Sequence, residues 1–234
     1  MLGNLARLIL PYAGVRDELR AARNAARRGF YSLRMEWLSG GLKSERHGDI
    51  KPGIKINVGC GPLIREDWVN VDLFPRKGAA YVDVRNGLPF TAAQAVHIHC
   101  EHFMEHLSFE EAVLFLRESY RVLMPGGTLR IIVPDAAKYM AAYCRGDTGF
   151  FAEFARLGNA QTDLDTPVKV INQMFRMGGD HKFAWDFHTL AKEAKQIGFS
   201  EAIASSYNDQ PAEFAIDGTD DWRKAESLYA TLRK

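Results

Sequence analysis

From residue 54 onward, short apolar runs alternate with longer segments of helical periodicity. Several runs are apolar throughout, as expected for parallel strands that are buried on both faces. This order predicts an α/β fold, a Rossmann-like, mostly parallel sheet of about seven strands with helices on both faces. The predicted strands are residues 54–58, 68–73, 80–84, 95–100, 128–133, 202–207 and 227–232.

Two helices are predicted with clear boundaries. The first covers residues 109–124, where Ser108 and Glu111 have the spacing of a capping box. The second covers residues 189–197. Between them, irregular segments rich in Phe, Met and Tyr predict a helical insertion at about 136–180, either a cover over a pocket or an ordinary helical excursion.

Residues 1–53 have a different pattern, with arginines at helical spacing among alanines and an apolar stripe on the other side. We therefore expect an N-terminal amphipathic helical extension (1–53) and a core domain (54–234). The favoured interpretation is that the apolar side of this helix packs on the core. Weak contact with a membrane surface and contact with a partner protein are the alternatives.

Composition narrows the classes of function. Lys and Arg total 30 and Asp and Glu total 29, so the net charge of +1 gives no general attraction to nucleic acid, and none is expected as a partner. The three cysteines are widely spaced, which disfavours a disulfide framework and fits a reducing cytoplasm. No apolar run approaches the roughly 20 residues that span a bilayer. A cytoplasmic location is predicted, and nothing sets the oligomeric state.

A candidate ligand site follows the first predicted strand. That strand ends in Gly59-Cys60-Gly61, and the next strand ends at Asp72. Glycines let the backbone approach a ligand, and a carboxylate at the end of the second strand accepts a ribose diol. A pyrophosphate requires a third glycine that opens a helix, but Pro62 follows here. The pattern favours a nucleoside over a dinucleotide.

The step from Gly59 to Asp72 is shorter than the roughly 20 positions of the dinucleotide pattern, too short for a regular crossover helix. The first helix of the fold should therefore be reduced to a turn. One face of the sheet would then be uncovered, and we hypothesise that the N-terminal helix fills the vacancy.

Six segments support this interpretation because they occur in a recognisable order: 56–61, Asp72, 83–90, 100–107, 121–129 and 181–198. Together they resemble the class I S-adenosylmethionine (SAM) dependent methyltransferases, and more closely a bacterial subgroup of predicted methyltransferases similar to methyltransferase type 11. The resemblance covers about residues 54–234. It implies SAM as the cofactor, with Asp72 on the ribose and the segment from Asp83 on the adenine.

The resemblance also implies a set of cofactor-binding residues and an acceptor. The set is Gly59, Cys60, Gly61, Pro62, Asp72, Leu73, Asp83, Val84, Cys100 and Glu101. The expected reaction moves a methyl group to an O or N acceptor on a small molecule or glycan-type metabolite. A catalytically silent methyltransferase-like binding or interaction module is the alternative.

Four of the seven histidines lie within ten residues, at His97, His99, His102 and His106. The order His102-x-x-Glu105-His106 matches a zinc pattern in which both histidines lie on one helical face, so a zinc metallohydrolase is a second alternative. This segment, however, lies between a strand and a helix cap, and no third ligand is evident. No metal is expected, and His97 and His99 are interpreted as structural.

Catalytic candidates come from the ends of the late strands, where ligands bind in open α/β sheets. Methyl transfer to a hydroxyl or amine requires removal of a proton, for which histidine is suited. His102 is the first candidate base, His181 the second, and Asp135 lies at the corresponding end of the next strand. A hydrogen-bonded structural role is the alternative for each histidine.

Overall fold

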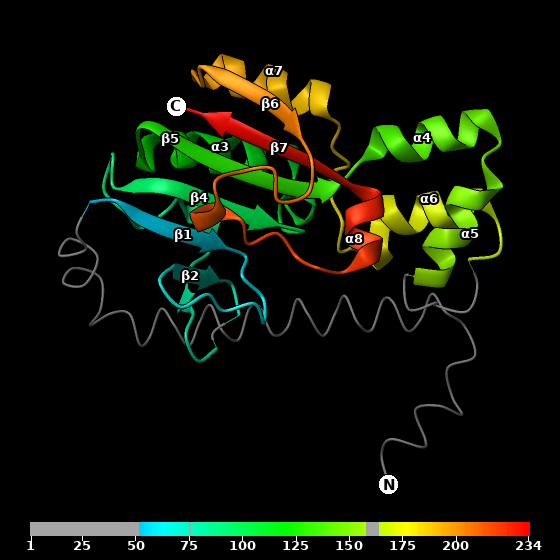
Figure 1. Ribbon diagram of the computed structural model, residues 1–234, viewed down its shortest axis with the longest axis horizontal. Helices are drawn as coiled ribbons and strands as arrows, with labels where there is room; N and C mark the ends of the chain where they lie inside the picture. Colours follow the sequence, from blue (N-terminus) through cyan, green and yellow to red (C-terminus); the bar gives the residue numbers. More distant parts are fainter. Residues whose placement is uncertain (1–51, 75, 158–163) are drawn as a thin grey trace, which may run out of the picture.

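The computed structural model describes residues 52–74, 76–157 and 164–234. It contains a seven-stranded sheet in the order β3-β2-β1-β4-β5-β7-β6 (Figure 1). All pairs from β3 to β5 are parallel, and β7 is antiparallel to both β5 and β6. The predicted mostly parallel, Rossmann-like sheet is confirmed. The strands are β1 (Ile54–Val58), β2 (Val69–Asp72), β3 (Ala80–Tyr81), β4 (Ala95–Glu101), β5 (Leu123–Pro134), β6 (Glu201–Ser205) and β7 (Ser227–Arg233).

The N-terminal helix and its proposed packing fall almost entirely outside the described residues, so the division at residue 53 stays a prediction. None of the helices in the described part is both long and apolar enough to cross a membrane. The α-helices are α3 (Phe109–Val122), α4 (Ala136–Arg145), α5 (Thr148–Leu157), α6 (Pro167–Arg176), α7 (Phe187–Ile197) and α8 (Asp221–Glu226). Short 3-10 turns are η1 (Val84–Asn86), η2 (Met104–His106), η3 (Met177–Gly179) and η4 (Ala212–Phe214).

The capping box of α3 is formed as predicted. The Ser108 hydroxyl accepts from the Glu111 backbone N–H at 3.3 Å, and the Glu111 carboxylate accepts from the Ser108 N–H at 2.7 Å. The helix ends two residues earlier than expected, because Leu123 is already extended and pairs with Ala95 at the start of β5. Predicted strand 80–84 is also shorter, because Asp83 caps η1.

The connection between β1 and β2 contains no helix, as its length predicted. Two buried asparagines hold it instead. The Asn57 amide donates to Leu63 O and to Asn70 Oδ1, at 2.9 and 3.1 Å. Asn70 accepts from the Arg65 N–H and donates to the Arg65 carbonyl. These side chains satisfy backbone groups that a helix would have paired internally.

One face of the sheet is apolar and lies under α3 and α7. Its core contains Ile56 of β1, Ile98 of β4 and Leu129 of β5, all fully buried. Phe115 of α3 and Leu190 of α7 pack against them. Burial of this surface is the main source of the fold's stability.

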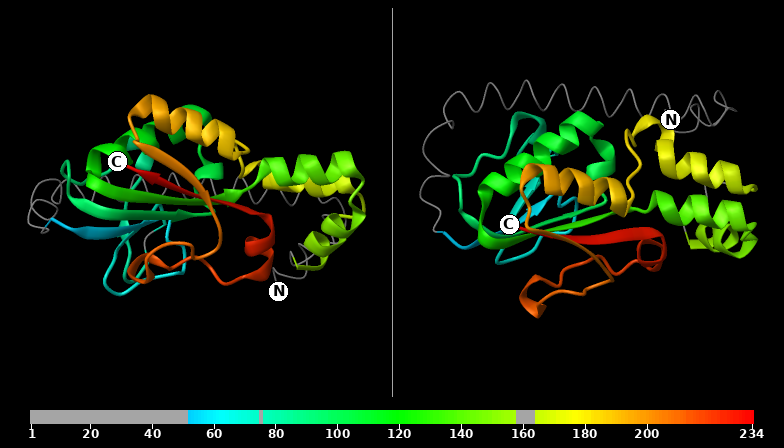
Figure 2. Two further views of the ribbon diagram at one scale, coloured as in Figure 1. Left: turned by 45° about the horizontal axis from the view of Figure 1, so that its top comes forward. Right: turned by 90° about the horizontal axis from the view of Figure 1, so that it is seen from above.

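The opposite face is polar, which corrects the prediction that several strands are apolar on both sides. His97, His99 and Arg130 alternate with the apolar residues of β4 and β5, and each is at most 2% exposed. Figure 2 shows, in its right-hand view, that the segment between β6 and β7 lies on this side while α3 and α7 lie on the other. Phe214 of η4 stacks on His97, with ring centroids 4.3 Å apart. A loop therefore covers much of the face that lost its crossover helix.

Helices α4, α5 and α6 lie beyond the carboxyl ends of the central strands (Figure 1, Figure 2). They have a small apolar core of their own, which includes Tyr139 of α4, Phe151 of α5 and Met174 of α6. The Tyr139 hydroxyl donates to the Glu226 carboxylate at the end of α8. This group of helices is thereby held to the end of the sheet where the strands terminate.

Candidate functional site

Two cavities lie side by side at the carboxyl ends of β1, β2 and β4, and they share Gly59 and His102. Cavity A has a volume of about 360 Å³ and is also lined by Asp72, Leu73, Phe74, Asp83, Val84 and Phe103. Cavity B has a volume of about 240 Å³ and is also lined by Gly61, Pro62, Arg65, Glu101, Asp220 and Arg223.

The turn after β1 requires glycine at residue 59. Gly59 has φ +64°, and a Cβ there would lie 2.5 Å from Cδ2 of Phe103. Gly61 has φ +50°, and its N–H donates to Asp72 Oδ2 at 2.8 Å. Because only glycine adopts these angles without strain, the turn brings the backbone against both cavities.

Asp72 is anchored by backbone donors on both oxygens. Oδ2 accepts from Gly61, and Oδ1 accepts from the Phe74 N–H at 2.7 Å. An ionised carboxylate has about four acceptor positions, so each oxygen keeps one for a ligand in cavity A. This side chain is held rigidly enough to accept a ribose diol.

The far side of cavity A is formed by η1. Asp83 accepts from Arg85 through Nε at 2.7 Å and Nη2 at 2.5 Å. Burial alone would raise the pKa of Asp83, but its hydrogen bonds to Arg85 outweigh burial and lower the pKa. Arg85 was not among the predicted site residues, although its position two residues after a turn-forming aspartate was an available signal.

Cavity B is covered by residues 214–223. Glu101 accepts from the Gly218 N–H at 2.8 Å and from Arg223 Nη1 at 3.0 Å, and Arg65 donates to the Ile216 carbonyl at 2.9 Å. Arg65, Asp220 and Arg223 could not be predicted as site residues, because only the return of the chain over the sheet places them here.

Glu101 should make stability depend on pH. Burial would raise its pKa, but the nearby His99 ring and the hydrogen bonds from Arg223 and Gly218 outweigh burial and lower the pKa from 4.5 to about 2. A depressed carboxyl pKa stabilises the folded state above the unfolded value and loses that contribution as pH falls from 4.5 toward 2. The contribution at neutral pH is about 3 kcal/mol at most.

Urea unfolding between pH 3 and 6 measures this effect. The free energy of unfolding of the wild type should fall below pH 4.5 more steeply than that of Glu101→Gln. Equal slopes for the two proteins would show that Glu101 titrates normally.

His102 faces both cavities in an uncommon backbone conformation, with φ +47°. Its Nε2 lies 2.9 Å from the Ser227 hydroxyl, and its Nδ1 lies 3.4 Å from Glu105 Oε1. Ser227, His102 and Glu105 are thus arranged like a nucleophile, a base and an acid. Ser227 is only 1% exposed, however, so its hydroxyl is not accessible as a nucleophile. Non-glycine residues with positive φ are concentrated at functional sites.

All predicted cofactor-binding residues except Cys100 line one of the two cavities. Cys100 lies in the core, fully buried on the apolar face. Asp135 lines neither cavity, since its carboxylate caps α4 by accepting from the Ala137 N–H at 3.0 Å. His181 lies beside Glu105 and His106, and burial lowers its pKa. The structure therefore brings His102, but not His181, Asp135 or Cys100, to the lining of the cavities.

The structure does not form the helical zinc-binding arrangement that the sequence His102-x-x-Glu105-His106 suggests. Residues 104–106 are a single 3-10 turn, and His102 precedes it in a left-handed conformation. His102 and His106 therefore do not share a face of an α-helix, which the metallohydrolase pattern requires.

No family model matches the sequence, and no curated protein matches it. Similar solved structures include a SAM-dependent methyltransferase from Archaeoglobus fulgidus, at 15% identity and a TM-score of 0.46 over 88% of this chain and 94% of that one. The 1,6-didemethyltoxoflavin-N1-methyltransferase of Burkholderia thailandensis, solved with S-adenosylhomocysteine, has 11% identity and a TM-score of 0.47 over 96% and 92%. A possible histamine N-methyltransferase from Thermotoga maritima has 15% identity and a TM-score of 0.48 over 90% and 95%. Likeness at this level carries no functional argument, so the function rests on the site.

Proposed function

We propose that this chain is a nucleoside-binding α/β enzyme, and specifically a SAM-dependent methyltransferase. The observation that carries the proposal is the pair of cavities that meet at Gly59 and His102. Cavity A offers a carboxylate for a ribose, and cavity B lies across the glycine turn, where an acceptor would enter. This arrangement supports a cofactor site and an acceptor site that share one boundary.

The β1–β2 connection supports a nucleoside rather than a dinucleotide. A pyrophosphate is bound by the N-terminus of a helix that opens directly after the glycine turn. Residues 59–68 contain no helix, so that group of backbone donors is not formed. SAM carries a ribose and an adenine but no phosphate, which fits the donors and acceptors present.

Named residues would hold the cofactor and the acceptor. Asp72 accepts the ribose hydroxyls, and Leu73, Val84 and Phe103 supply apolar contacts around the base. When bound, SAM supplies an electrophilic methyl group on sulfur. His102, at the junction of the cavities, accepts the proton of the attacking hydroxyl or amine, which requires rotation away from Ser227.

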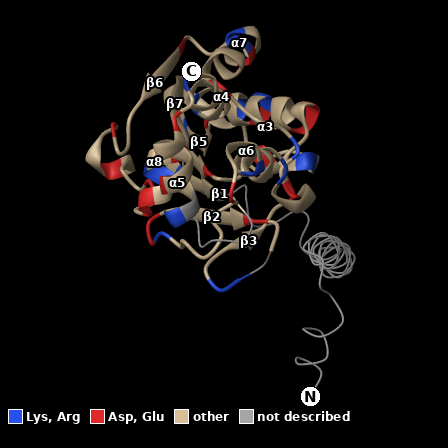
Figure 3. Cartoon of the chain, turned by 90° about the vertical axis from the view of Figure 1, so that its right-hand side faces the viewer, with Lys and Arg blue, Asp and Glu red and all other residues tan. Residues whose placement is uncertain are grey.

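The acceptor in this proposal is a small molecule or a glycan-type metabolite. The limited volume of cavity B and its polar lining, in which Arg223 is ion-paired with Glu101 and Asp220, support a compact polar acceptor. On the side shown in Figure 3, acidic and basic residues among those described are interspersed over α3 and around α8, and these described residues form no single-sign stripe of the kind that binds nucleic acid.

The test measures transfer and cofactor affinity together. Full-length protein is incubated with methyl-labelled SAM and a metabolite extract, and SAM affinity is measured by calorimetry. Labelled product supports the enzyme. Tight binding without transfer, or no binding at all, favours the alternative of a catalytically silent module.

Replacing His102 should lower turnover by about 10²-fold or more, the usual contribution of a general base, while SAM affinity changes only a few fold. His102→Ala tests this loss, and His102→Asn repeats it with a residue that tolerates the positive φ. His188→Ala, at an exposed histidine of α7, is the matched control and should keep full activity. Full activity in both His102 variants would remove this residue from the mechanism.

A further inference from the structure

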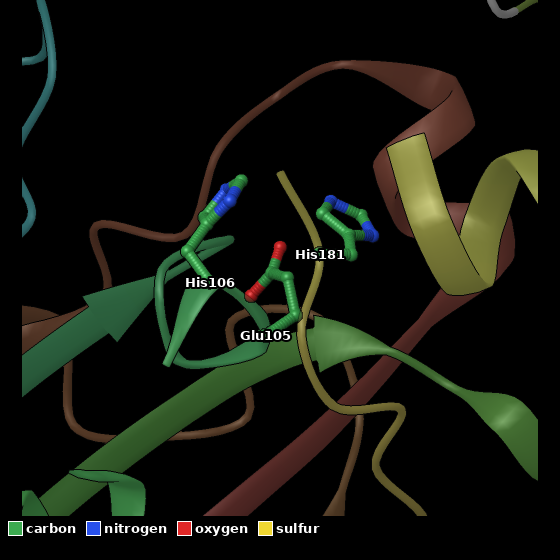
Figure 4. A group of neighbouring side chains, drawn as sticks. All are labelled: Glu105, His106 and His181. Carbon is green, nitrogen blue, oxygen red and sulfur yellow. The ribbon is translucent and has the colours of Figure 1, made fainter. Parts of the chain in front are cut away.

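Three side chains from separate parts of the chain converge beside cavity A. Glu105 and His106 belong to η2, and His181 follows η3. One oxygen or nitrogen from each lies within 4.8 Å of the others. Figure 4 shows the Glu105 carboxylate between the two imidazole rings. The proposed methyl transfer uses none of these three groups.

The hydrogen bonds of the two histidines fix which nitrogen carries the proton. His106 Nδ1 lies 3.0 Å from the Asp180 carbonyl, and His181 Nδ1 lies 2.5 Å from the Met174 carbonyl. A carbonyl only accepts, so each Nδ1 must donate. In a neutral ring, each Nε2 then keeps a free lone pair. A backbone carbonyl thus orients each ring through Nδ1, as is usual for histidines that bind a metal through the other nitrogen.

Glu105 is a buried carboxylate with a single ion-pair partner in the described part of the chain, the His102 ring. It is 2% exposed, and neither of its oxygens has a hydrogen-bond partner in the described part of the chain. The nearest charged or ionisable group is His102, with Nδ1 at 3.4 Å. A buried, unpaired carboxylate costs several kcal/mol unless a cation or hydrogen bonds compensate it. The Nε2 lone pairs of His106 and His181 are further hydrogen-bond acceptors near the Glu105 carboxylate, and they give it no donor.

We propose that Glu105, His106 and His181 bind a divalent transition-metal ion, with zinc as the best match to two nitrogens and one carboxylate. Ligand atoms around a tetrahedral zinc are about 3.4 Å apart, and the three atoms here lie within 4.8 Å of one another, so no pair must close by more than about 1.4 Å.

Three protein ligands leave a coordination position open, which is typical of sites where water or substrate binds. Of the three ligands, His106 lines cavity A, so the ion would lie at the edge of that cavity. The ion also joins η2 to the segment after η3, and it should stabilise the fold. The proposal does not depend on SAM binding.

The test uses untagged, full-length protein and two independent readouts. Metal content is measured by mass spectrometry after dialysis, and Zn²⁺ and Co²⁺ are titrated by calorimetry and absorption. We expect about one zinc per chain, visible-range Co²⁺ bands from a site of low symmetry, and a rise in melting temperature with added Zn²⁺. These outcomes are read without SAM, so they are separate from failure of methyl transfer.

Variants localise the ion. His181→Gln and Glu105→Gln should each weaken Zn²⁺ affinity by about 10-fold or more and remove the Zn²⁺-dependent rise in melting temperature, whereas His188→Ala should behave as wild type. A wild-type protein that neither retains nor binds Zn²⁺ or Co²⁺ overturns the proposal. Equal Zn²⁺ affinity in the wild type and in His181→Gln also overturns it, since the ion would then lie elsewhere.

Discussion

Asp72→Ala is expected to weaken SAM binding by two or more orders of magnitude. The wild-type carboxylate keeps one free acceptor position on each oxygen, facing cavity A, while its other positions hold Gly61 and Phe74. Hydrogen bonds to a charged group contribute about 1.5–3 kcal/mol each, so loss of two costs about 3–6 kcal/mol. The dissociation constant measured by calorimetry should rise by about 10² to 10⁴-fold.

Asp83→Ala is the matched control, because it removes an aspartate from the same cavity. Arg85 already occupies the Asp83 carboxylate, so a smaller loss of affinity is expected. Near-ultraviolet circular dichroism of each variant shows whether the glycine turn keeps its packing. If Asp72→Ala binds SAM as the wild type does, cavity A does not hold the ribose and the proposed cofactor site is wrong.

The conformation of the glycine turn and the position of Asp72 could be predicted from the sequence because both depend on local properties. Positive φ at Gly59 and Gly61 and the position of an acid at the end of β2 are set within a few residues. The missing crossover helix was equally visible, since loop length limits what a loop can contain. The position of cavity A therefore follows from local sequence features, before any long-range contact is considered.

The covering of the polar face could not be predicted in the same way. Residues 206–220 carry no periodic pattern, and Phe214 and Asp217 reach β4 and β5 only because β6 and β7 pair antiparallel at the sheet edge. His181 likewise joins Glu105 only through the path of α4 to α6. A pattern along the chain shows spacing, whereas both of these contacts depend on tertiary packing.

Asp217→Ala should destabilise the protein more than any surface substitution. Arg130 is fully buried, and its five donors are all used: two by Asp217, two by Ser205 and Thr231, and one by the Ser206 carbonyl. Removal of one partner leaves an uncompensated buried charge, at a cost of about 3–5 kcal/mol. The free energy of unfolding in urea should fall by this amount, and the melting temperature by about 10 °C.

Two further variants distinguish the loss of an ion-pair contact from the cost of leaving the Arg130 charge buried without a partner. Glu201→Ala breaks the ion pair between Glu201 and Arg233, two side chains that are each about half exposed. It should lower the free energy of unfolding by at most about 1 kcal/mol. The double variant Arg130→Met with Asp217→Leu removes both charges and should recover part of the loss, because apolar replacement of a buried pair is often neutral.

Gly218, the neighbour of Asp217, donates to Glu101, so Asp217→Ala should also loosen the cover of cavity B. A loss of less than 1 kcal/mol in Asp217→Ala would show that water reaches Arg130 and that this loop does not seal the polar face.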